Sequence, residues 1–161
     1  MISRSTKPQT AESVYPYALR LLAARDYSLA RMRAKILAQG VAEDDAETVL
    51  DRLQREGWLN DRRYAERFAE IALTNGRFYG SRLKMEMRRR GLESELVDDV
   101  LSALQEEFDE TSELEAMVRR RYPGFSYSNA TDRDKRRIVA YLQRRGFGLS
   151  TILKVLRSAE Q

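Results

Sequence analysis

The sequence predicts an all-α protein made of three tandem three-helix repeats arranged in a row. Two observations predict it. Segments separated by 51 and then by 55 positions share one pattern of basic, apolar and glycine residues. Charged residues also make up 34% of the 161 residues, with only eight glycines and three prolines, which is typical of a helical protein. Units of this size bury their apolar faces by stacking on their neighbours.

The repeated unit is clearest in the middle of the chain, where a basic helix, a glycine and a second helix follow one another. Leu83 and Met87 are four residues apart in the basic helix and therefore share one inward face. Glycine then ends the helix, because it adopts the left-handed conformation that satisfies the last carbonyl groups. The next residue is apolar and packs back onto the helix. The equivalent pairs are Gly40 with Val41, Gly91 with Leu92, and Gly146 with Phe147.

Residues 1–12 are polar and are expected to form a disordered tail. The first repeat, residues 13–59, opens with a helix that has Pro16 in its first turn, where the missing N–H is no loss. Ser28 is expected to cap the second helix. The third helix spans about 43–56 and has apolar residues at i, i+3, i+4 spacing.

The second repeat, residues 60–110, begins with a helix capped by Asn60 or Asp61. Trp58 lies in the connection just before it. Because stacked repeats must seal their joints, Trp58 is expected to form a wedge between the first two units. The repeat continues through the central basic helix to a last helix over about 94–107.

The third repeat, residues 111–161, is less regular, as terminal repeats often are. Pro123 and Gly124 break its first helix, and a polar loop, FSYSNATD, follows. A basic helix then ends at the third repeat glycine. The last helix is expected over about 150–156.

The composition excludes most kinds of enzyme site. The chain has no cysteine and no histidine, which excludes disulfides, thiolate nucleophiles, Cys/His zinc sites and imidazole bases. Adjacent acids such as Asp44 and Asp45 point in different directions on a helix, which is poor geometry for a metal pair. We expect no enzyme activity, metal or cofactor. With no apolar run long enough to span a bilayer and no secretory signal, we expect a cytoplasmic monomer that does not bind membranes.

Charge is distributed unevenly along the chain. Residues 77–90 hold six bases and one acid, a net charge of +5. Residues 92–115 hold ten acids and no base, and residues 119–145 hold nine bases and two acids, a net charge of +7. Basic segments therefore flank an acidic one.

The helical register turns many of these bases to one outward face, which we call the basic row. With the apolar stripe inward, Arg82 and Arg89 lie seven residues apart on the outer face. Guanidinium groups suit phosphates or a carboxylate-lined protein groove, since each can make two charge-assisted hydrogen bonds. Phe78 and Tyr79, on the preceding loop, are expected to add exposed aromatic contacts. The candidate partner-binding residues are Arg31, Arg77, Arg82, Lys84, Arg88, Arg89, Arg90, Arg120, Arg137, Arg144 and Arg145.

Four segments carry a resemblance to a known family: YALRLLAARDYSLARMRAKILAQG, EGWLNDRRYAERFA, YGSRLKMEMRRRGLE and DKRRIVAYLQRRGFG. From about Tyr17 to Leu156 the chain closely resembles the RecX family of bacterial regulatory proteins. The resemblance implies three-helix units stacked into an elongated curved array that binds the RecA recombinase filament on single-stranded DNA. It also implies inhibition of ATP hydrolysis, strand exchange and co-protease activity, and hence a part in DNA repair, recombination and the SOS response. The family often has an acid where this chain has Arg31.

An alternative is a DNA-binding protein whose repeats work as helix-turn-helix-like units. The basic row and the sequence pI of about 9.5 favour it. The stretch of ten acids opposes it, as does the lack of an aromatic platform for single strands. Direct contact with single- or double-stranded DNA stays open beside the filament as a partner.

Overall fold

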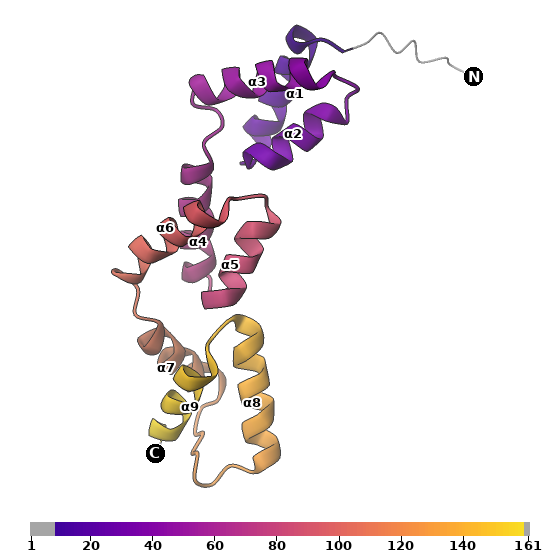
Figure 1. Ribbon diagram of the computed structural model, residues 1–161. Helices are drawn as coiled ribbons and strands as arrows, with labels where there is room; N and C mark the ends of the chain where they lie inside the picture. The colour runs from indigo at the N-terminus through magenta and orange to yellow at the C-terminus, as the bar shows by residue number, and fades with distance from the viewer. Residues whose placement is uncertain (1–8, 160–161) are drawn as a thin grey trace, which may run out of the picture.

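The computed structural model describes residues 9–159, and over this range the chain forms nine α-helices and no strand. Figure 1 shows them as an elongated, gently curved row, which confirms the predicted all-α fold. None of the described helices is long and apolar enough to cross a bilayer. The helices are α1 (Ala11–Ala24), α2 (Leu29–Leu37), α3 (Glu43–Arg55), α4 (Asp61–Thr74), α5 (Gly80–Arg89), α6 (Ser94–Gln105), α7 (Glu110–Arg121), α8 (Asp132–Arg145) and α9 (Leu149–Ser158).

The predicted polar tail is too long at its C-terminal end. Residues 1–8 lie outside the described residues, but Ala11 and Glu12 already belong to α1. The helix begins there because Thr10 and Ser13 form a capping box, in which each side chain accepts a hydrogen bond from the other's backbone N–H.

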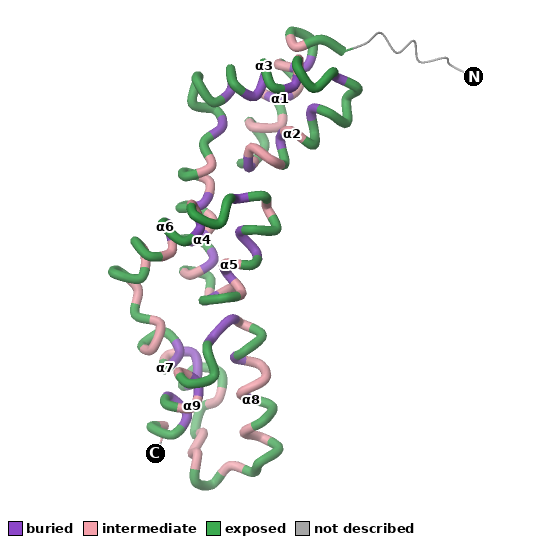
Figure 2. Tube along the Cα trace, viewed as in Figure 1, coloured by how far each residue is buried: buried purple, intermediate pink, exposed green. Residues whose placement is uncertain are grey.

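The helices pack in threes, and each group of three encloses its own small core (Figure 2). The main helix-to-helix contacts join α1, α2 and α3, then α4, α5 and α6, then α7, α8 and α9. The apolar positions predicted from the repeat register all face these cores. They are Met32 and Ile36 in α2, Leu83 and Met87 in α5, and Ile138 and Leu142 in α8, each at most 3% exposed.

The glycine stops also occur where the register predicts them. Gly40, Gly91 and Gly146 have φ angles of 82°, 83° and 107°, in the left-handed region. The apolar residue after each glycine is buried. Leu92 N–H donates to the carbonyl of Met87, as the Schellman-type stop requires.

The second helices of the three groups lie end to end along one side of the array, at the right in Figure 1. They are α2, α5 and α8. We call this side the middle-helix edge. Tyr79 N–H, at the start of α5, donates to the carbonyl of Arg145 at the end of α8 over 2.9 Å. The Ser28 hydroxyl, at the start of α2, donates to the carbonyl of Arg90 at the end of α5. Ser28 is equivalent to Tyr79 in the repeat register, and Arg90 to Arg145, so the two joints use the same positions.

Trp58 does not form the predicted wedge, since its exposed fraction is 52%. The joint between the first two groups is sealed by a close approach of small residues instead. A Cβ atom at Gly91 would lie 2.4 Å from the Cβ of Ala30, so only glycine allows the two helix ends to meet. An aromatic residue does fill the second joint, and it is Tyr79.

Candidate partner-binding surface

The structure places five exposed members of the basic row on the middle-helix edge. Arg31 comes from α2, Arg88 and Arg89 come from α5, and Arg137 and Arg144 come from α8. Because the three helices lie end to end, all three groups of helices contribute residues to this edge. These five arginines therefore belong to helices on one side of the array, and they stay candidates for partner binding.

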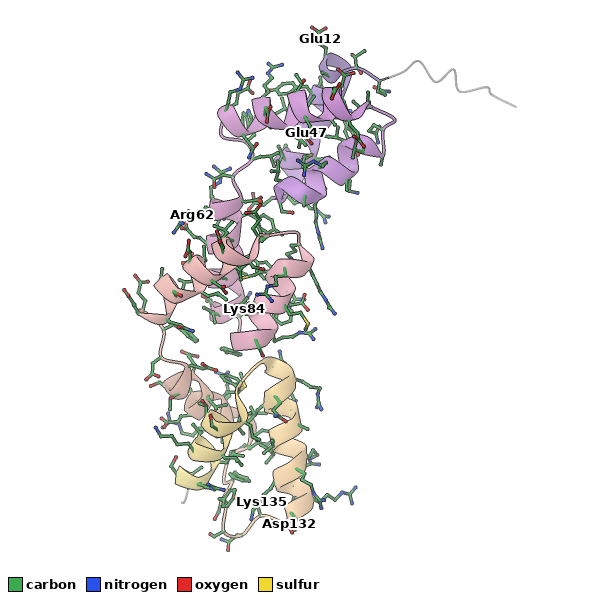
Figure 3. All side chains as sticks on the ribbon, in the orientation of Figure 1. Glu12, Glu47, Arg62, Lys84, Asp132 and Lys135 are labelled. Atoms are coloured by element: carbon green, nitrogen blue, oxygen red, sulfur yellow. The ribbon has the colours of Figure 1, made fainter. Side chains whose placement is uncertain are left out.

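Three other candidates lie beside the row. Arg77 is exposed on the loop before α5, and Arg120 is exposed on α7. Lys84 belongs to α5 but turns toward α6, where its ammonium group pairs with Asp98 (Figure 3).

Arg90 and Arg145 act mainly within the fold. The Arg90 side chain is only 22% exposed and its guanidinium lies 4.1 Å from the centre of the Phe68 ring. Arg145 is half-buried and donates across the second joint to the carbonyl of Gly76 at 3.4 Å. These two equivalent arginines connect helices and joints rather than extending into solvent.

The centre of the basic row is organised by one buried carboxylate, that of Glu86, whose residue is 8% exposed. Its Oε1 lies 2.9 Å from Nη2 of Arg82 and 3.3 Å from Nη1 of Arg89, and its Oε2 lies 3.2 Å from Nη1 of Arg90. In the sequence, Glu86 stands out only as the one acid among the six bases of residues 77–90. The spacing of four residues from Arg82 and four to Arg90 could have revealed the cluster, because such residues meet on one helical face.

The prediction that Phe78 and Tyr79 are both exposed is wrong for Tyr79, which is 2% exposed. Its ring stacks on Phe147 with centroids 4.3 Å apart, so a residue at the start of α5 completes the core of the third group. Burial there raises the pKa of the Tyr79 hydroxyl. Phe78 is partly exposed, and the guanidinium groups of Arg77 and Arg82 lie 5.5 and 5.7 Å from its ring centre.

The acidic stretch lies mainly on α6, the connection that follows it, and the start of α7. Figure 1 shows α6 and α7 on the opposite side of the array from α5 and α8. A pocket of about 480 Å³ opens where α5, α6 and α7 meet, and Leu101, Leu104 and Phe108 contribute apolar surface to it. Glu110 also lines this pocket, and burial raises the pKa of its carboxyl group. Within residues 9–159, no group of three or more acidic side chains could hold a metal ion.

Known proteins resemble this chain in amino-acid sequence and in the arrangement of its helices. Residues 15–53 match the family model for RecX, first three-helix domain. Regulatory protein RecX of Trichlorobacter lovleyi is 44% identical over 133 residues, which cover 83% of this chain and 86% of that protein. Regulatory protein RecX of Thermus thermophilus is 40% identical over 146 residues, which cover 90% of this chain and 91% of that protein.

The crystal structure of RecX from Lactobacillus salivarius has the same fold. It superposes with a TM-score of 0.77 at 17% identity, and the match covers 92% of this chain and 95% of that one. The segments that carry the sequence resemblance therefore lie in a chain with the fold of a solved RecX. This chain belongs to the RecX family of regulatory proteins.

Proposed function

We propose that this protein binds the RecA filament on single-stranded DNA and inhibits its ATPase, strand-exchange and co-protease activities. It would thereby modulate recombination and the SOS response. Membership of a family whose members are named regulatory protein RecX supports this proposal. The structural observation that supports it is a set of five exposed arginines on three helices that lie end to end and are joined by hydrogen bonds.

The length of the middle-helix edge suits a partner made of repeated subunits. Its helices contain 9, 10 and 14 residues. At about 1.5 Å per residue the lengths of the three helices sum to roughly 50 Å, more than the diameter of a small domain, about 30 Å. A row of this length reaches acidic surface on more than one protomer of a filament.

Contacts to two protomers at once would hold them in one relative orientation. A ligand shifts a conformational equilibrium only by its difference in affinity for the two states. A rigid bridge has such a difference, because it fits one spacing of its two binding surfaces and not another. The inhibitor would then slow ATP turnover by populating one arrangement of the filament.

The test uses a variant in which Arg31, Arg88 and Arg144 are changed to glutamate. These residues come one from each group, are exposed, and make no ion pair within the described part of the chain. Arg82 and Arg89 are less suitable, because glutamate there would crowd carboxylates around Glu86. The matched control changes Arg20, Arg55 and Arg119 to glutamate, with the same change in net charge.

The measurement is ATP hydrolysis by a RecA filament preassembled on saturating single-stranded DNA, with the protein added well below one molecule per protomer. The wild-type chain and the control should inhibit. The row variant should need at least about tenfold more protein, since one lost charge-assisted hydrogen bond already costs about 1.5 kcal/mol or more. Equal inhibition by the row variant and the wild type would refute the assignment.

Direct DNA binding is the second candidate, and the net charge of +7 over residues 119–145 favours it. In that case inhibition would appear only near one molecule per protomer and would vanish when free DNA is added. The affinity for DNA would also fall steeply with salt concentration.

A further inference from the structure

We propose that Glu86 sets the selectivity of the basic row for a protein surface over nucleic acid. Its carboxylate holds Arg82 and Arg89 in place for carboxylates at defined positions on a partner protein, and it lowers the attraction for generic polyanions. This inference rests on the proposed function of the basic row and names the residue that tunes it.

The geometry makes Glu86 a support beneath the exposed arginines. Its side chain is 10% exposed, while those of Arg82 and Arg89 are 37% and 61% exposed. Oε1 contacts both of these arginines, at 2.9 and 3.3 Å. Arg90 contacts Oε2 at 3.2 Å and also donates to the backbone carbonyl of Glu86 at 3.0 Å. The arginines cover the carboxylate and still present part of their surface to solvent.

The same carboxylate has opposite effects on two classes of partner. A long arginine side chain loses rotamer freedom when it binds, and a side chain that is already held in place loses less. Holding the arginine side chains in place therefore favours binding to a protein surface whose carboxylates lie at matching positions. Binding to a polyanion depends mainly on the number of phosphates neutralised, so one negative charge among three arginines weakens it.

The repeats themselves indicate that this acid is specific to the middle group. The positions equivalent to Glu86 hold Lys35 in α2 and Tyr141 in α8. The Tyr141 hydroxyl accepts a hydrogen bond from Arg145 at 3.2 Å, so an acid is not required to hold an arginine in this fold. Among the three equivalent positions, only the one in α5 therefore holds a carboxylate.

The experiment compares Glu86→Gln with Glu47→Gln. Glu47 is an exposed acid that pairs with Arg33 between α3 and α2, with contacts of 2.7 and 3.2 Å (Figure 3). Each substitution raises the net charge by one unit and removes the acid from an arginine, but only the first alters the basic row. Binding of a single-stranded oligonucleotide is measured across a range of salt concentrations, and inhibition of RecA filament ATPase is measured in parallel.

For Glu86→Gln we expect oligonucleotide affinity to rise severalfold and its salt dependence to steepen by about 0.7, the value for one further phosphate contact on single strands. We expect inhibition of the filament to weaken severalfold. Glu47→Gln should leave both within about twofold of the wild type. If the two variants behave alike, or if Glu86→Gln moves both activities in the same direction, Glu86 has no such role.

A folding defect is handled with a second variant. If circular dichroism shows that Glu86→Gln is unfolded, Glu86→Tyr takes its place, because α8 already holds a tyrosine at the equivalent position. The same outcomes then apply. A wild-type chain that does not inhibit the filament would refute the proposed function. A wild-type chain that inhibits, with the Glu86 variant matching the Glu47 control, would refute only the role of Glu86.

Discussion

Replacing Gly146 with alanine should separate the second group of helices from the third. Gly146 has φ 107°, and a Cβ atom built on it would lie 1.8 Å from the carbonyl oxygen of Tyr79 and 2.7 Å from the Cβ of Arg82. Both neighbours are at the start of α5 and cannot move aside as a flexible side chain could. The helix ends must move apart, which breaks the 2.9 Å hydrogen bond from Tyr79 N–H to Arg145.

The loss of stability expected for Gly146→Ala can be calculated by comparison with Gly40→Ala, which serves as an internal control. Gly40 occupies the equivalent position in the first group with φ 82°, but no atom lies within 4 Å of its added Cβ. Gly40→Ala therefore measures the backbone strain alone, about 1–2 kcal/mol. Gly146→Ala adds the loss of one hydrogen bond, about 1 kcal/mol, and of the stacking between Tyr79 and Phe147, about 1 kcal/mol. We expect the free energy of unfolding to fall by about 3–4 kcal/mol.

Urea unfolding gives the free energies, and amide hydrogen exchange at Tyr79 reports on the joint itself. In Gly146→Ala the Tyr79 amide should exchange much faster than in the wild type, because its acceptor has moved away. In Gly40→Ala it should stay protected. Unchanged protection of Tyr79 in Gly146→Ala, or equal losses of stability in the two variants, would refute the close-approach argument.

Two further substitutions test the other joint and the pocket. Ser28→Ala removes the hydroxyl that accepts from Arg31 N–H at 3.3 Å and donates to Arg90. The free energy of unfolding should fall by about 1–2 kcal/mol in urea titrations, and a loss below about 0.5 kcal/mol would contradict this role of the cap. Burial raises the pKa of Glu110 above its ordinary value of 4.5. The contribution of protonated Glu110 to the free energy of unfolding is therefore fully present below pH 4.5 and is lost as the pH rises through the raised pKa. Glu110→Gln removes this decline, so its thermal midpoint should exceed that of the wild type at pH 7 and match it near pH 3.5. An equal difference at both pH values would contradict the assignment to ionisation.

The repeats, the inward apolar stripes and the glycine stops could all be predicted from the sequence. Positions such as Leu83, Met87 and Gly91 could be assigned because helical periodicity and helix termination depend on residues a few positions apart. The outward placement of Arg31 and Arg144 follows from the same local rule. The alignment of α2, α5 and α8 into one continuous edge does not, since it depends on how the groups stack.

The contacts at the joints between groups of helices could not be predicted from the sequence and depend on the folded structure. Tyr79 was predicted to be exposed and is buried, because its ring packs in the core of the third group of helices. Trp58 was predicted to form a wedge between groups and is exposed. Glu86 had recognisable spacing in the sequence, but its burial beneath three guanidinium groups depends on the side-chain positions that the fold imposes. Gly146 had a local reason to be glycine, and the structure adds a second: its nearest neighbour is the carbonyl of Tyr79, far away in the chain. Local spacing determines the helices, whereas contacts between distant residues determine the joints and the ion pairs.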